Sequence, residues 1–171
     1  DNVLNAANPS LADVEAKYGA YNTLPAEDVL IVMRSPGDIV RELLIPLPGP
    51  PQPLLERITG GTTLVDVERD AWLDLVDGAY LQENCNQAGL NPSQASAAFV
   101  RIGIVGNNED GCGSPDSWLG VGGSPMDYSL GTAGGFCGDA AAPANATVGN
   151  ARQCSGANDG AVAAFAYVFV R

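Results

Sequence analysis

The chain has 171 residues and a formal net charge of -12 at pH 7, because 20 acidic side chains outnumber 8 basic ones. Such a charge repels nucleic acids and anionic membranes, whose binding depends on cationic side chains. We therefore expect no nucleic-acid partner. No run approaches the roughly 18 apolar residues of a membrane span, so we expect no membrane insertion either. The acidic excess serves solubility in one interpretation and the binding of cations by clustered carboxylates in another.

Residues 1–53 are expected to form an N-terminal arm with a helix and a hairpin. The helix is predicted over residues 9–21, where a serine can cap the first turn and acidic side chains suit the helix dipole. Two apolar runs, at 28–33 and 39–47, flank a Ser-Pro-Gly-Asp turn and predict a β-hairpin. Five of the eight residues at 46–53 are prolines, which predict a stiff connector or an exposed edge that meets a partner.

The middle of the chain alternates short apolar runs with turn residues. Residues 62–70 are predicted to form a strand, and residues 71–76 a strand or a helical turn. A short helix is expected over residues 93–98, directly after an Asn-Pro pair. Residues 98–105 have the apolar character of a buried strand.

Residues 106–160 are rich in glycine and are predicted to be loop-like, apart from an apolar piece at 118–121. The terminal residues 161–171 are apolar and are expected to pair inside a sheet. Together these elements predict an α+β fold, with a small twisted, mostly antiparallel sheet, short helices and a long loop-rich, disulfide-stapled C-terminal region. Residues 1–171 are long enough for one core, so we expect a single domain.

Four cysteines stand at wide spacings, with no CxxC pair and no histidine to complete a zinc site. An even number in this pattern predicts two disulfides, for which three pairings exist. We favour the sequential pairing, Cys85–Cys112 and Cys137–Cys154, because it closes short loops around glycine-rich segments. Disulfides form in oxidising compartments, and the protein is therefore expected to be secreted or at the cell surface.

Most catalytic arrangements are excluded by composition. Without histidine, Ser-His and Cys-His dyads cannot form, and paired cysteines offer no thiol nucleophile. The single lysine, Lys17, is not part of a phosphate-binding GxxxxGK loop. Glycoside hydrolysis by two carboxylates is the one enzymatic alternative. We therefore expect a binding or structural domain and not an enzyme.

Oxygen-bearing side chains are concentrated in the loop from residue 107 to residue 116. Calcium prefers six to eight oxygen ligands from carboxylates, amides and backbone carbonyls, and glycines let the carbonyls join. The alternative is a tight turn in which Asn and Asp bond their own backbone. Asp127 could complete a metal site from outside the loop. The candidate donors within it are Asn107, Asn108, Glu109, Asp110, Ser114 and Asp116.

Aromatic side chains near this loop could receive a sugar. Tyr128, together with Asp127, is the candidate for ligand binding, whereas Trp118 precedes a leucine and is predicted to be a core residue. Asn145 begins an Asn-Ala-Thr glycosylation sequon. Asp159 stands before a glycine and is better explained by a turn.

The C-terminal part of the chain contains an ordered series of motifs: NNE at 107–109, a cysteine at 112, SPDS at 114–117, GVGG at 120–123, a cysteine at 137 and FAYVFVR at the end. With this series, residues 97–171 resemble the C-terminal part of fibrinogen-like lectins, closest to the intelectin-type branch and its bacterial relatives. The resemblance implies a calcium-stabilised domain that, in the intelectin branch, binds exocyclic diols of sugars through the metal. It makes Asn107, Asn108 and Glu109 first candidates for the metal region, with Asp116 and Asp127 as further ligands.

Intelectins place a histidine in this loop and this chain has none, so the resemblance supports metal binding more than sugar binding. The function we predict is an extracellular calcium-binding domain for carbohydrate recognition, with calcium as cofactor and a carbohydrate or cell-surface glycan as partner. The alternative is a structural or assembly subunit of an extracellular surface layer or filament, which associates with further copies of itself.

Overall fold

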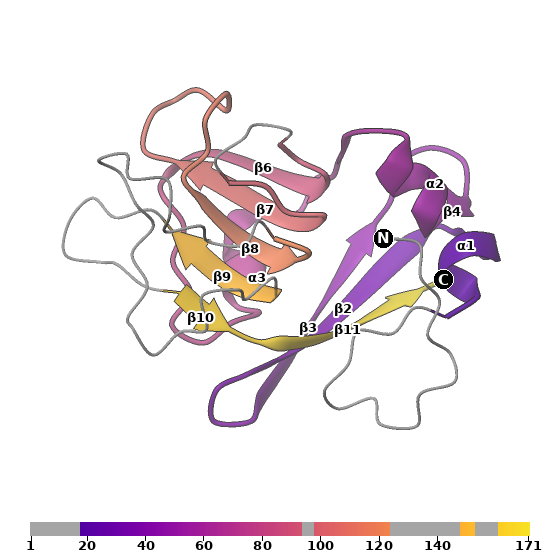
Figure 1. Ribbon diagram of the computed structural model, residues 1–171, viewed down its shortest axis with the longest axis horizontal. Coiled ribbons are helices and arrows are strands. Elements are labelled where there is room, and N and C mark those ends of the chain that lie inside the picture. The colour runs from indigo at the N-terminus through magenta and orange to yellow at the C-terminus, as the bar shows by residue number, and fades with distance from the viewer. Residues whose placement is uncertain (1–17, 94–97, 124–147, 153–160) are drawn as a thin grey trace, which may run out of the picture.

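A computed structural model describes residues 18–93, 98–123, 148–152 and 161–171. These residues form antiparallel β-sheets with three short helices (Figure 1), which confirms the predicted α+β fold. In chain order, the elements are α1 (Ala20–Thr23), β1 (Pro25–Ala26), β2 (Asp28–Ser35), β3 (Ile39–Pro46), β4 (Gln52–Pro53), α2 (Leu54–Thr59), β5 (Thr63–Leu64), α3 (Arg69–Leu73), β6 (Asn84–Leu90), β7 (Ile102–Asn107), β8 (Ser117–Val121), β9 (Val148–Arg152), β10 (Ala161–Ala163) and β11 (Phe165–Val170).

The strands are arranged in two main sheets. A six-stranded sheet has the order β10-β9-β8-β7-β6-β5, and a three-stranded sheet has the order β11-β2-β3. A third, minor pairing joins β1 to β4. Strands β10 and β11 are separated by Ala164 alone, so the C-terminal segment runs from one sheet directly into the other (Figure 1).

The hairpin predicted from the two apolar runs is confirmed by β2 and β3. They pair from Asp28 opposite Pro46 to Ser35 opposite Ile39. The turn contains Gly37 at φ 83°, a backbone conformation that glycine adopts without strain. The terminal strand is also confirmed, and β11 pairs antiparallel with β2 on the side away from β3.

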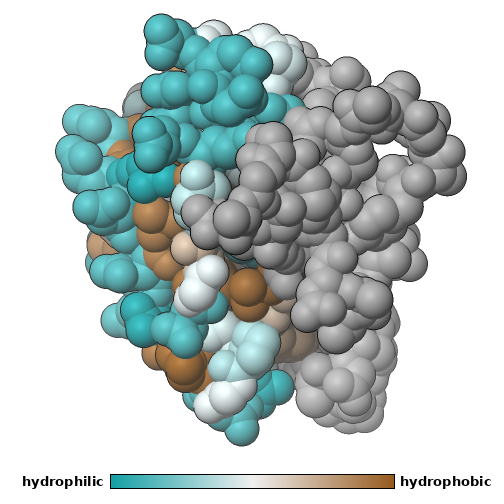
Figure 2. Space-filling model, turned by 90° about the vertical axis from the view of Figure 1, so that its left-hand side faces the viewer, coloured by the Kyte–Doolittle hydropathy of each residue, from teal (hydrophilic) through white to brown (hydrophobic). Residues whose placement is uncertain are grey.

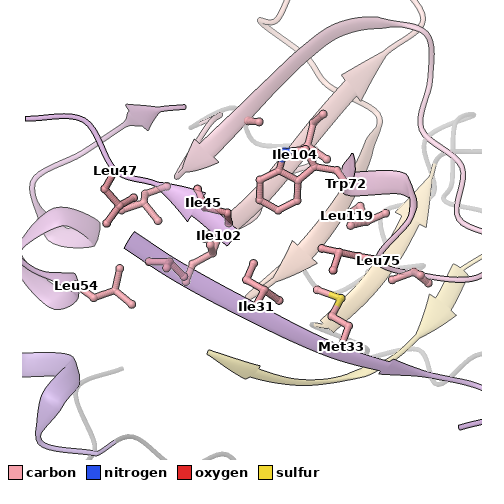
Figure 3. Packing of buried hydrophobic residues seen from close by; sticks show 14 of the residues in the cluster. Ile31, Met33, Ile45, Leu47, Leu54, Trp72, Leu75, Ile102, Ile104 and Leu119 are labelled. Carbon is pink, nitrogen blue, oxygen red and sulfur yellow. The ribbon is translucent and has the colours of Figure 1, made fainter. Parts of the chain in front are cut away.

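Apolar side chains from both sheets meet in one core. Strand β2 alternates between buried and more exposed positions, as the period of two in a strand requires. Figure 3 shows Ile31 and Met33 of β2 pointing toward Leu75 and Leu119. The core also contains Val29, Ile45, Leu54, Trp72, Leu81, Leu90, Ile102 and Ile104.

The six-stranded sheet is also covered on its other face. There, Trp118 of β8 stands opposite Val105 of β7, and Ala98 and Val100 pack with both. Trp118 has no exposed surface, which confirms its predicted role in the core. The neighbouring pair, Ile104 and Leu119, points to the opposite face and into the main core.

Four glycines form a row across the six-stranded sheet. Gly89, Gly103, Gly120 and Gly149 stand opposite one another in successive pairs of strands. A Cβ atom on any of them would collide with a backbone carbonyl of an adjacent strand; at Gly120 that carbonyl belongs to Ile102. Only glycine fits this row, which therefore explains part of the glycine content of the C-terminal half.

Three sequence-based boundaries are wrong. The strand predicted over residues 62–70 is limited to Thr63–Leu64. Helix α3 covers Arg69–Leu73, which is the helical one of the two alternatives predicted for residues 71–76. Within the region 106–160, β8 coincides with the predicted apolar piece at 118–121, whereas β9 is a strand where a loop was expected. The buried strand predicted over residues 98–105 is shifted toward the C-terminus, to Ile102–Asn107.

The proline-rich segment 46–53 is a connector that leads from β3 to α2, and a buried arginine binds its backbone. Arg57 of α2 is buried, and its two amino groups donate hydrogen bonds to the carbonyls of Pro48 and Pro50 at 3.0 and 2.8 Å. At its end, Gln52 and Pro53 pair with β1 as the short strand β4.

The helices predicted over residues 9–21 and 93–98 lie largely outside the described residues; α1 begins only at Ala20. None of the helices in the described ranges is long and apolar enough to cross a membrane.

Candidate metal centre

The β7–β8 loop (residues 108–116) projects from one end of the six-stranded sheet (Figure 1). On the side of the molecule shown in Figure 2, hydrophilic residues cover the upper part of the described surface, at the height where this loop projects. A disulfide between Cys85 and Cys112, with 5.1 Å between the Cα atoms, ties the loop to β6. This confirms one of the two predicted bridges, whereas Cys137–Cys154 lies outside the described residues.

Asn107 gives the loop its shape. The residue is 1% exposed, and its Nδ2 donates a hydrogen bond to the Gly111 carbonyl at 2.6 Å. Its Oδ1 accepts a hydrogen bond from the backbone N–H of Asn108 at 3.0 Å. Both ends of the amide are thus engaged with the loop backbone, as in the turn interpretation, so Asn107 acts first as a structural residue.

The next residues lie at the exposed tip. Asn108 donates a side-chain hydrogen bond to Oε1 of Glu109 at 3.0 Å, and its carbonyl accepts one from Asn84 of β6 at 2.9 Å. Glu109 and Asp110 are exposed. The tip therefore carries two carboxylates and one amide. Its backbone is held in place by contacts with β6.

Asp116 brings a carboxylate back to the base of the loop. Its backbone N–H donates to the carbonyl of Gly106 at 3.0 Å, and the residue is only partly exposed. Burial raises the pKa of Asp116, the negative charge of Glu109 raises it further, and a hydrogen bond from the Gln82 side chain opposes both. Asp116 and Glu109 are thus close enough to repel one another, and a cation between them would relieve that repulsion.

Gln82 supplies an oxygen that no sequence motif indicates. The residue is 8% exposed, and its side chain bonds to Asp116. Its Oε1 is buried and has no hydrogen-bond partner among the described residues. A buried amide oxygen without a partner is costly, and a cation would satisfy it. Gln82 lies 34 positions before Asp116, so only the pairing of the strands brings the two together.

The donor set around the loop is partial. In the described part of the chain, no three Asp, Glu, Cys or His side chains gather closely enough to hold a metal by themselves. Calcium there would need amide, carbonyl and water oxygens in addition to the carboxylates of Glu109 and Asp116, which is a common composition of its shell. The predicted ligands Asp127 and Tyr128 lie outside the described residues, as do Asn145 and Asp159.

Comparison with known proteins gives no match: no family model, no curated protein and no solved structure matches the chain significantly. The fibrinogen-like resemblance of residues 97–171 therefore stays a prediction.

Proposed function

We propose that the protein is a secreted or cell-surface calcium-binding domain, and not an enzyme, in which the β7–β8 loop holds the ion. The observation that supports this most is the placement of the partly buried Asp116 carboxylate near the charge of Glu109 and beside Gln82, whose buried Oε1 has no hydrogen-bond partner among the described residues. Two carboxylates on a disulfide-tied loop form a place of negative potential that a divalent cation would neutralise. The disulfide Cys85–Cys112 also favours an oxidising compartment.

In this proposal, each residue of the loop has a separate role. Asp116 and Glu109 would be charged ligands, and Gln82 would add a neutral oxygen from its unpartnered Oε1. Asn108 and Asp110 would supply further oxygens from the tip, and Asp127 would add a ligand from outside the loop. Asn107 would keep the backbone curved through its bond to Gly111.

The bound ion would serve carbohydrate recognition. This part of the proposal rests on the resemblance to intelectin-type lectins, in which calcium contacts the sugar, and it assigns the sugar contacts to Asp127 and Tyr128. We expect the protein to bind an immobilised glycan array in calcium and to be released by EDTA. Retention in EDTA would contradict a sugar site built on the metal.

Thermal unfolding tests the metal site itself. A ligand at about 100 times its Kd stabilises the folded state by about 2.7 kcal/mol. For a chain of this size, each kcal/mol moves Tm by about 2–4 °C, so millimolar calcium should raise Tm by about 5–10 °C. Asp116→Asn should remove this shift.

The matched control is Asp66→Asn, which removes an exposed carboxylate from the segment between β5 and α3. This variant should keep the full calcium shift. If wild-type Tm does not respond to millimolar calcium, or if both variants lose the response equally, the proposed site is wrong.

A second candidate function, a subunit of an extracellular assembly, is favoured by a different observation. Four large apolar side chains are exposed on the side of the three-stranded sheet that is turned away from the core, far in sequence from the β7–β8 loop. They are Val40 and Leu44 of β3 and Tyr167 and Phe169 of β11.

A further inference from the structure

Two candidate ligands at the base of the β7–β8 loop come from segments far apart in the sequence. Gln82 precedes β6, which begins at Asn84, and Asp116 directly precedes β8, which begins at Ser117. Strand β7 lies between β6 and β8 in the six-stranded sheet (Figure 1). The relative position of the two ligands therefore depends on contacts across three strands, and the side chain of Ser117 makes such contacts.

Ser117 has no exposed surface. Its Oγ accepts a hydrogen bond from the backbone N–H of Gln82 at 3.1 Å. The same hydroxyl donates a hydrogen bond at 3.1 Å to the carbonyl of Gly106, which stands opposite Ser117 in β7. One buried hydroxyl thus connects the backbone of Gln82 to both β7 and β8.

The carbonyl of Gly106 also anchors the second ligand. It accepts a hydrogen bond from the backbone N–H of Asp116 at 3.0 Å, in addition to the one from Ser117. A carbonyl oxygen has two lone pairs and can accept both bonds. Asp116 directly, and Gln82 through Ser117, are therefore anchored by their backbones to one oxygen atom of β7.

Space around this oxygen is tight. A Cβ atom on Gly106 would lie 2.7 Å from the carbonyl oxygen of Gln82 and 2.9 Å from the Oγ of Ser117. The absence of a side chain at position 106 lets the Gln82 backbone approach β7 this closely. The Gln82 side chain in turn bonds to Asp116, and its buried Oε1 has no hydrogen-bond partner among the described residues.

We propose that Ser117 is a positioning residue of the metal site. Through the backbone of Gln82, it holds the Gln82 Oε1 where a calcium ion bound by Asp116 can use this oxygen as a neutral ligand. The inference rests on the proposed calcium site and adds to it a residue that does not touch the ion. Replacing a residue that orients a metal ligand typically lowers metal affinity by about 10- to 100-fold.

The alternative is that Ser117 contributes to stability alone, because it gives a buried N–H and a buried carbonyl their partners. Both roles predict that Ser117→Ala lowers Tm in EDTA, since each of these groups loses a bond. The two roles differ in the calcium affinity of the folded protein. Only a positioning residue changes that affinity, and it does so through Gln82.

Isothermal titration of the full chain with calcium chloride measures this affinity. We expect Ser117→Ala to raise the Kd for calcium by at least about tenfold. Gly106→Ala should raise it similarly, because the added Cβ would displace the Gln82 backbone. The matched control is Ile104→Val, which removes a methylene group from the core side of the same strand. This variant should have a lower Tm and a Kd within about twofold of the wild type.

A double-mutant cycle shows whether Ser117 acts through Gln82. Gln82→Ala removes the neutral ligand and leaves the carboxylates of Glu109 and Asp116. In this background, Ser117→Ala should raise the Kd by less than about threefold, because the ligand that it positions is already gone. If Ser117→Ala does not fold, the same cycle is made with Gly106→Ala.

Three results would overturn the proposal and leave the calcium site standing. The first is a Ser117→Ala protein that binds calcium like the wild type while Asp116→Asn does not bind it. The second is an equal loss of affinity with and without Gln82, which would mean that Ser117 stabilises the loop as a whole. The third is an equal loss in Ile104→Val. A wild-type protein that binds no calcium at about 10 mM, above the Kd of weak extracellular sites, would overturn the calcium site and the role of Ser117 together.

Discussion

Asp116 is a side chain whose charge opposes folding as long as no cation is present. Its pKa is raised, first by burial and then by Glu109, so the folded protein holds the proton more tightly than the unfolded chain. Between the ordinary value of 3.8 and the raised pKa, stability therefore falls as pH rises, and the loss is complete above the raised pKa.

Asp116→Asn should consequently stabilise the protein at pH 7 in EDTA. The gain is discounted because the group is partly exposed, and we expect less than about 1 kcal/mol. This corresponds to a rise in Tm of about 1–3 °C, which should vanish below pH 3.8, where both side chains are neutral. Thermal melts of both proteins from acidic to neutral pH provide the measurement, and a variant that is less stable than wild type at pH 7 would contradict the sign.

The individual side chains of the loop show where sequence reasoning stops. The run of oxygen donors in residues 107–116 and the disulfide to Cys85 could be predicted, because both depend on residue types and spacing. The sequence of the loop fits Asn107 both as a metal ligand and as a turn former, and its two hydrogen bonds favour the second role. Gln82 could not be found, because only the fold brings it to Asp116.

The strands show a similar division. The β2–β3 hairpin was predictable, since a period of two, a Pro-Gly turn and β-branched residues are all local signals. The strand expected over residues 62–70 has the same alternation, yet only Thr63 and Leu64 pair. Pairing depends on a partner strand that the local sequence does not specify. The many glycines after residue 100 predict loops, although Gly103, Gly120 and Gly149 belong to the glycine row inside the sheet.

The glycine row gives a prediction about the six-stranded sheet. Gly120 has φ 146°, which other residues avoid, and a Cβ there would collide with the Ile102 carbonyl of β7. Gly120→Ala should therefore destabilise the protein by at least about 2 kcal/mol. Gly113→Ala is the control, because a Cβ on Gly113 would have no atom within 4 Å, and it should change stability by less than about 0.5 kcal/mol.

Urea denaturation in EDTA measures both variants without interference from calcium. Equal stabilities of the two alanine variants would mean that the strands can separate locally to admit a Cβ, and that the row does not require glycine.

The two sheets depend on one another through the core and through the chain that joins them. Ile31 and Met33 of the small sheet pack with Ile104 and Leu119 of the large one, and β10 passes into β11 across Ala164. Neither sheet could expose its inner face without losing that burial. The described strands should therefore unfold together, as the predicted single domain requires.

The two tryptophans can test this cooperativity, because they lie on opposite faces of the large sheet. Trp72 belongs to the core between the sheets and Trp118 to the cluster with Val105. The Trp118→Phe variant reports on Trp72 alone, and Trp72→Phe reports on Trp118 alone. In each variant, the urea midpoint from fluorescence should agree with the midpoint from far-UV circular dichroism within about 0.2 M. In one outcome, the fluorescence of Trp118 changes at a lower urea concentration than the circular dichroism signal, while that of Trp72 does not. The cluster around Trp118 would then unfold on its own, and the chain would not behave as one cooperative unit.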